Sequence, residues 1–138
     1  MKKLIVALVF SFSMHEMSAQ EWLELYNQCV TDYGNYNLDG AKVKCVQALN
    51  IFTDQVSAEH TIRQLSLITY ENGDLDTALV YANREISILQ NLNQQAESNY
   101  GNALSNVGQI NLAIGNYEDA KTQFSDALIN LQNFYTED

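Results

Sequence analysis

The stretch "GNYEDAKTQFSDAL", residues 115–128, carries small and large apolar side chains at helical spacing. Ala120 and Ala127 stand seven residues apart with Phe124 between them, and a Gly-Asn pair opens the stretch. Two antiparallel helices approach closely only where small side chains on one helix meet a ridge of the other. The stretch therefore predicts a turn, followed by a helix that packs tightly on a neighbour with its phenyl ring beside the alanines.

A related pattern occurs twice upstream. "AKVKCVQAL" (residues 41–49) shares four of nine residues with "AKTQFSDAL" (residues 120–128), and "ALVYANREI" (residues 78–86) shares the opening alanine. The opening alanines are 37 and 42 residues apart, a period typical of stacked helical hairpins. A small residue stands twelve positions before each alanine, namely Cys29, Ser66 or Gly108. The repeat therefore predicts hairpins whose two arms touch at small residues.

The composition favours helices throughout. Proline, which breaks helix interiors, does not occur in the 138 residues. Alternating apolar runs of strand length are not found beyond residue 19. We therefore predict an all-α fold.

The three units resemble the tetratricopeptide repeat. The third unit carries most of the family pattern: Leu104, Gly108, Gly115-Asn116-Tyr117, Ala120, Phe124 and Ala127-Leu128. The resemblance implies a right-handed α-solenoid of about three antiparallel hairpins, with units at about residues 22–53, 59–91 and 101–134. A plain helical bundle, in which the alanines are ordinary packing residues, is the alternative.

Several departures from the family pattern are visible. Ala82 replaces the aromatic residue of the second unit, and Glu85 occupies its second small position. Gly34-Asn35-Tyr36 of the first unit lies two residues early. The family's terminal proline is missing, and the step of 42 residues exceeds the usual ~34, as in longer-helix variants of the family.

The first nineteen residues have the layout of a secretory signal peptide. Lys2 and Lys3 precede the uncharged apolar run at residues 4–12, and Ser18-Ala19 provides a small-residue end. The alternative is a buried first helix. Cleavage after Ala19 leaves residues 20–138 as the repeat domain, with no membrane span. We expect an exported bacterial protein, in the periplasm or outside the cell.

The charge balance excludes two kinds of partner. The chain has 17 acidic and 7 basic residues and a formal net charge of −10. Nucleic acids and anionic lipid surfaces are bound through basic residues, so neither is an expected partner.

No motif predicts catalysis or a cofactor. His60 is the only histidine after residue 19, and no metal-ligand spacing surrounds it. The chain contains neither a Gly-x-Ser-x-Gly elbow nor a phosphate-binding loop. We therefore expect no enzyme, no metal and no cofactor.

The two cysteines allow two interpretations. Cys29 and Cys45 fall on facing arms of the first predicted hairpin, where a disulfide is feasible. In an exported chain a lone pair of cysteines is a candidate disulfide. Alternatively, both are small core residues.

The family resemblance also implies a binding surface. In such proteins the first helix of each unit lines a concave groove, through a stripe that begins here at Leu23 and ends at Leu112. The groove is expected to hold a protein or peptide partner. Its predicted residues are Tyr26, Val30, Tyr33, His60, Arg63, Leu67, Tyr70, Asn102, Ser105 and Gln109. For Tyr26 and Tyr33, simple packing in the first hairpin is the alternative.

The last predicted helix ends in an apolar run. Residues 128–135 include Leu128, Ile129, Leu131, Phe134 and Tyr135. A terminal helix of a solenoid normally has a polar outer face, so this one is expected to contact another chain, as in a homodimer, or a missing C-terminal domain. The alternative function is thus an N-terminal sensing or regulatory arm of a larger signalling or peptidase protein.

Overall fold

The computed structural model describes residues 2–51 and 54–136, with side chains described from Ser18 onward. In this part of the chain all regular secondary structure is helical and there is no strand, which confirms the prediction of an all-α fold. The six helices are α1 (Lys2–Gly34), α2 (Leu38–Leu49), α3 (Gln55–Glu71), α4 (Leu75–Asn91), α5 (Ser98–Ile114) and α6 (Tyr117–Thr136).

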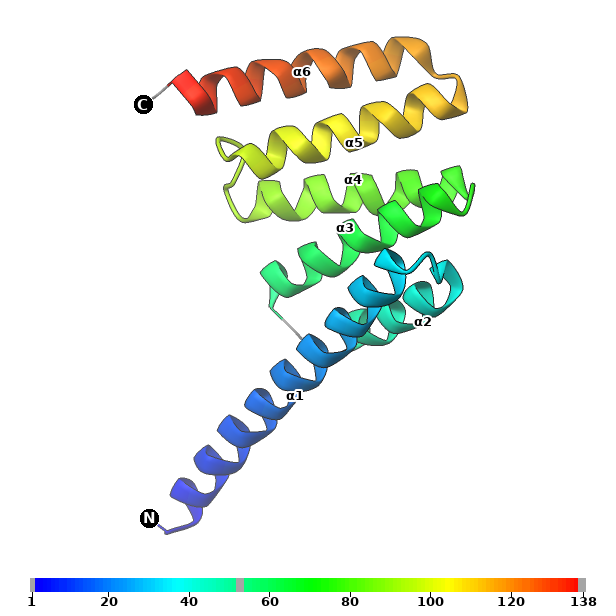
Figure 1. Cartoon of the computed structure of the whole chain (residues 1–138). Coiled ribbons are helices and arrows are strands. Elements are labelled where there is room, and N and C mark those ends of the chain that lie inside the picture. The colour runs from blue at the N-terminus through cyan, green and yellow to red at the C-terminus, as the bar shows by residue number, and fades with distance from the viewer. Residues whose placement is uncertain (1, 52–53, 137–138) are drawn as a thin grey trace.

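The helices pack in chain order, each beside the next (Figure 1). The most extensive contacts lie within the pairs α1–α2, α3–α4 and α5–α6, while α2–α3 and α4–α5 contacts join the pairs. The second pair spans residues 55–91 and the third spans residues 98–136. The predicted second and third units, at about residues 59–91 and 101–134, lie within these ranges.

Most side chains of the predicted signal peptide lie outside the part of the chain that the structure describes. Residues 2–17 are described by their backbone alone, as the first part of α1. Signal cleavage therefore stays a prediction. Among the helices of the described residues, none combines the length and the apolar character that a membrane span requires.

The turns within the three pairs share one backbone conformation. A left-handed residue lies five positions before each opening alanine: Tyr36 (φ 59°), Gly73 (φ 78°) and Gly115 (φ 97°). The following residue donates its backbone N–H to a carbonyl five positions back, with an N–O distance of 2.9 Å in every turn. This is the hydrogen bond that closes a Schellman motif. Tyr36 therefore occupies the turn position that glycine occupies in the other two pairs.

Side-chain caps start the second helix of the first two pairs. Asn37 Oδ1 accepts from the backbone N–H of Gly40 at 3.2 Å, and Asp74 Oδ1 accepts from that of Thr77 at 3.3 Å. Such caps satisfy N–H groups that the first helical turn leaves free. The sequence "GNY" at residues 34–36 resembles the third turn, but Asn37 is the residue that caps α2.

The small residues lie where the helices of a pair meet. Cys29, Ser66, Ala41 and Ala78 are fully buried, and Ala120 is 2% exposed. Ser66 Oγ donates to the carbonyl of Ala78 at 3.2 Å. A Cβ atom on Gly108 would lie 3.0 Å from the Phe124 ring, closer than ordinary packing allows. The predicted close contacts between paired helices are therefore present in all three pairs.

Two apolar clusters join neighbouring pairs. Cys29, Ala41 and Cys45 pack with Leu65 and Ile68 of α3 in the first cluster. The second cluster joins Ala78 and Ala82 of α4 to Val107 and Ile110 of α5. The core is thus a series of interfaces between successive helices.

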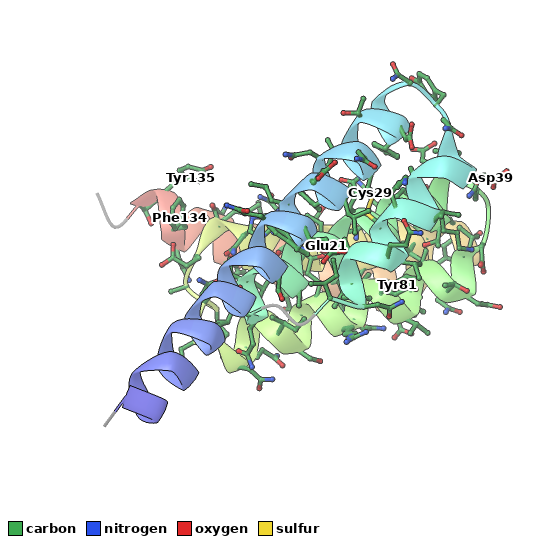
Figure 2. All side chains as sticks on the ribbon, turned by 90° about the horizontal axis from the view of Figure 1, so that it is seen from below. Glu21, Cys29, Asp39, Tyr81, Phe134 and Tyr135 are labelled. Atoms are coloured by element: carbon green, nitrogen blue, oxygen red, sulfur yellow. A yellow bond between two sulfur atoms is a disulfide. The ribbon has the colours of Figure 1, made fainter. Side chains whose placement is uncertain are left out.

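The apolar C-terminal run is only partly covered. Leu128 and Ile129 are each 56% exposed and Tyr135 is 69% exposed, while Leu131 and Phe134 are half-buried. Leu131 approaches Gly101 of α5, and Phe134 lies edge-on against Tyr135 (Figure 2). What covers this end of α6, a second copy or a further domain, stays a prediction.

Candidate functional site

A groove of about 230 Å³ lies between α3, α4 and α5. We call it the α3–α5 groove. It contains five of the ten predicted binding residues, together with Glu85 and Asn106, which were not among them. The described residues that line it are Arg63, Leu67, Glu85, Asn102, Ser105, Asn106 and Gln109.

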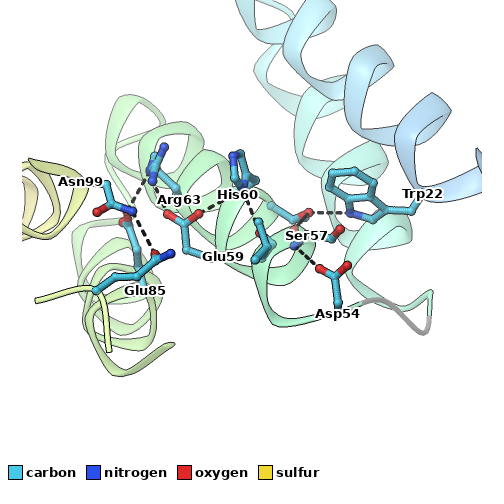
Figure 3. A network of polar contacts seen from close by, with 11 residues as sticks. Trp22, Asp54, Ser57, Glu59, His60, Arg63, Glu85 and Asn99 are labelled. Atoms are coloured by element: carbon cyan, nitrogen blue, oxygen red, sulfur yellow. Dashed lines mark hydrogen bonds and ion pairs between the residues drawn. The ribbon is translucent and has the colours of Figure 1, made fainter. Parts of the chain in front are cut away.

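Arg63, which lines the groove, contacts two buried carboxylates (Figure 3). Its Nε donates to Glu85 Oε1 at 2.8 Å, and its Nη2 donates to Glu59 Oε1. The side chains of Glu59 and Glu85 are 3% and 1% exposed, whereas that of Arg63 is 37% exposed. The guanidinium therefore bridges α3 and α4 while one part of it reaches the surface.

The surroundings of these groups shift their protonation equilibria. Burial raises the pKa of the Glu85 carboxyl from 4.5 to about 7, with a smaller contribution from the nearby Glu59, and the hydrogen bond and charge of Arg63 only partly offset this. Burial alone lowers the pKa of Arg63, but its contacts with Glu85 and Glu59 outweigh burial and raise that pKa overall. Arg63 thus stays charged, while Glu85 titrates near neutrality.

One carboxylate oxygen of this cluster has no hydrogen-bond partner. Arg63 donates hydrogen bonds to the Oε1 atoms of Glu59 and Glu85. His60 Nδ1 lies 3.0 Å from Glu59 Oε2. His60 Nδ1 also lies 2.8 Å from the Val56 carbonyl, so it faces two acceptors and carries the proton. Glu85 Oε2 is buried without a donor. Buried polar atoms are rarely left unpaired, so this oxygen marks the groove as a place for a ligand.

Uncharged polar side chains form the α5 wall of the groove. Asn106 Nδ2 donates to Ser66 Oγ at 3.0 Å, which fixes its amide and leaves its carbonyl oxygen as an acceptor. Within the described chain, the side chains of Asn102, Ser105 and Gln109 make no hydrogen bond across the groove. The wall therefore offers amide and hydroxyl groups to a ligand beside the buried carboxylate.

Tyr26 of α1 and His60 of α3 are not among the described residues that line the groove. Tyr26 stacks on Trp22 at a centroid distance of 5.1 Å and meets the His60 ring edge-on at 6.4 Å. Trp22 Nε1 donates to Thr61 Oγ1 at 2.9 Å, which ties α1 to α3 (Figure 3). Burial raises the pKa of the Tyr26 hydroxyl, and Arg63 partly opposes this. These two predicted residues therefore take part in the α1–α3 contact.

The remaining predicted residues are also separate from the groove. Tyr33 packs against the first apolar cluster and Tyr70 against the second, so both contribute to the interfaces between helices. Val30 is 40% exposed on α1. Of the described residues, those that line the groove include none of these three.

Glu85 was missed as a groove residue, although the repeat pattern singled it out. It lies seven positions after Ala78, as Ala48 and Ala127 lie after their opening alanines. Ala48 is fully buried and Ala127 is 4% exposed. A carboxylate at a buried alanine position is costly unless it is paired. The presence of a glutamate at a position of buried alanines was the sequence signal that could have identified Glu85 as a groove residue.

Cys29 and Cys45 form a disulfide between α1 and α2, with a Cα–Cα distance of 5.3 Å (Figure 2). Both residues are fully buried, and the described chain has no free cysteine. Within the same residues, no three His, Cys, Asp or Glu side chains gather as a metal site.

A larger hollow, of about 620 Å³, lies along α1. The described residues that line it all come from this one helix, among them Leu23, Asn27 and Asp32. None of its described side chains is a buried polar group without a partner. The α3–α5 groove is therefore the stronger candidate site.

A comparison with models of protein families matched no family, and a comparison with curated proteins found no significant match. The function must therefore be inferred from the groove itself.

Proposed function

We propose that the protein is a scaffold of the tetratricopeptide type that binds a protein or peptide partner in the α3–α5 groove. The single observation that carries this proposal is the buried Glu85 oxygen without a donor, in a groove whose other wall offers free amide and hydroxyl groups. Groups of this kind orient a ligand through hydrogen bonds. The three helix pairs with equivalent turns support a solenoid of this type.

We propose binding rather than catalysis. The only hydroxyl among the described lining residues is that of Ser105, and no base is hydrogen-bonded to it. Nucleophilic catalysis by serine depends on such a base. Arg63 and the amides instead form the polar groups of a recognition surface.

We also propose that the protein is exported. The layout of residues 1–19 and the buried disulfide support this independently, because disulfides persist mainly in oxidising compartments. Amino-terminal sequencing of protein recovered from the periplasm or the medium tests it, and a mature chain that begins at Gln20 is expected. Recovery of the full-length chain from the cytoplasm with both thiols free would contradict it.

The groove is tested by selecting binders from a displayed library of random dodecapeptides. We expect Ser105→Trp to weaken the selected peptides at least tenfold, because the indole fills the groove. Val80→Trp is the matched control, since Val80 is 66% exposed on α4 and does not line the groove. Fluorescence anisotropy measures both affinities. Equal binding to the parent and to Ser105→Trp would place the peptide elsewhere and contradict the proposal.

A further inference from the structure

We propose that the α3–α5 groove binds a lysine side chain of the partner, whose ammonium group donates a hydrogen bond to Glu85 Oε2. This inference rests on the proposed function and names the group that the groove recognises. Three observations carry it: the unpartnered oxygen, the charge of the cluster, and the acceptors opposite.

The oxygen requires a donor. Glu85 is 1% exposed, and its Oε2 is the one carboxylate oxygen of the Glu59–Arg63–Glu85 cluster without a partner. Glu85 is one of the residues that line the groove, so a donor group that enters the groove comes close to this oxygen. A buried carboxylate oxygen without a donor is costly, and this cost favours binding of a ligand that supplies one.

The cluster also requires positive charge. Two carboxylates share one guanidinium, because among the described residues Arg63 is the one Lys or Arg side chain in contact with Glu59 and Glu85. Once Glu85 is ionised, above its pKa of about 7, a neutral donor would leave this excess of negative charge unchanged. A cation removes it, and the chain's net charge of −10 attracts cationic segments from a distance.

The single unpartnered oxygen favours ammonium over guanidinium. An ammonium group has three donors on a compact centre at the end of a four-carbon stem, whereas guanidinium is a wide planar fork. Glu85 Oε2 takes one donor, and the carbonyl oxygens of Asn102, Asn106 or Gln109 are candidates for the others. Leu67 provides an apolar surface for the stem. A lysine side chain reaches a buried oxygen through a groove of about 230 Å³ more readily than the main-chain amine of an N-terminus.

The proposal is tested first with the parent protein and two small probes. n-Butylammonium carries the stem and donors of lysine, while n-butyltrimethylammonium has the same charge and no N–H. Titrations followed by ¹⁵N NMR at the side-chain amides of Asn102, Asn106 and Gln109 should show saturable shifts with the first probe and at least tenfold weaker binding of the second. Equal binding of the two probes would overturn the assignment.

A variant and the selected peptides complete the test. Glu85→Gln should weaken n-butylammonium at least tenfold, whereas Glu21→Gln, at an exposed carboxylate, should not. Among the selected dodecapeptides, acetylation of one lysine should abolish binding, and acetylation of the N-terminus should leave it intact. Loss of binding only after N-terminal acetylation would overturn the lysine assignment. Peptides that lack lysine but still lose affinity for Ser105→Trp would contradict this inference while supporting the proposed function.

Discussion

At the scale of single residues, Glu85 shows how one substitution within a repeat alters a site. The equivalent positions in the other pairs are buried alanines, Ala48 and Ala127, which only allow helices to approach. The glutamate adds a buried charge, and Arg63 and Glu59 then form an ion-pair cluster around it. Removal of Arg63 would leave two buried carboxylates without their cation, so the three residues act as a unit.

Glu85 makes the stability of the protein depend on pH. Its pKa is about 7 in the folded chain and near 4.5 otherwise, so between these values the folded state binds more protons than the unfolded state. Stability from this group is therefore complete below about pH 4.5 and is lost as the pH rises through 7, by up to about 1.4 kcal/mol per pH unit. Urea denaturation of the parent and of Glu85→Gln at pH 5 and pH 8 measures this, and the parent should lose more stability.

The control for this prediction is Glu21→Gln, which keeps the groups around Glu85. The charged groups beside Glu85 are Glu59 and Arg63 of α3, while the described groove residues of α5 are uncharged. These groups remain in both Glu21→Gln and Glu85→Gln. The difference in pH-dependent stability between the parent and Glu85→Gln therefore comes from Glu85. Equal pH dependence of stability in the parent and in Glu85→Gln would contradict the prediction.

At the scale of elements, the turns between paired helices depend on a left-handed residue. Only glycine adopts a positive φ without steric cost. Gly115→Ala should therefore destabilise the protein by about 1 kcal/mol, because alanine is strained at φ 97°. Tyr36→Gly should have the opposite sign and stabilise it by a few tenths of a kcal/mol up to about 1, since the 87% exposed ring contributes little packing.

Urea midpoints measure both turn variants, and Gly34→Ala is the matched control. Gly34 ends α1, has no positive φ and has open space around its Cα, so alanine there should be neutral or slightly stabilising. A similar loss of stability for Gly34→Ala and Gly115→Ala would show that the left-handed conformation is not the cause.

The elements also show how much of this protein could be predicted from its sequence. Helices, pairs and close contacts followed from Ala41, Ala78 and Ala120, because helix–helix contact restricts side-chain size at fixed spacing. Arg63, Leu67 and Ser105 line one groove because they follow the helical period, while their role in binding stays a prediction. The packing of Tyr70 could not be predicted, and that of Tyr33 was one of two alternatives, because an aromatic ring at a helix edge turns toward either face. Neither could the partners of Glu85, which depend on the distance between α3 and α4.

At the scale of the whole molecule, stability is distributed over interfaces between successive helices. In such stacks each pair contacts only its neighbours, so local changes alter nearby pairs most. The disulfide lies within the first pair, where α2 is also the shortest of the six helices in the described chain. This pair is therefore expected to depend on the disulfide more than the others depend on any single bond.

Removal of the disulfide should destabilise the first pair by about 3 kcal/mol, the loop-closure value for a separation of 16 residues. In the double variant Cys29→Ser/Cys45→Ser, the backbone amides of α2 should exchange hydrogen faster than in the parent. Exchange in α5 and α6 should change little. The untreated parent protein should resist thiol reagents without reductant. Equal acceleration in all helices, or rapid labelling of the parent at both cysteines, would contradict this prediction.

The equivalent turns have a consequence for how such a chain can be recombined. The three turns place the left-handed residue at the same distance from the opening alanine, so the chain has the same length between these two points in every pair. The longer step between the second and third alanines instead reflects α4, which has 17 residues where α2 has 12. The turns within the pairs thus keep one geometry, while the lengths of the helices differ from pair to pair. A hairpin could be lengthened, exchanged or duplicated without redesigning the turn that closes it.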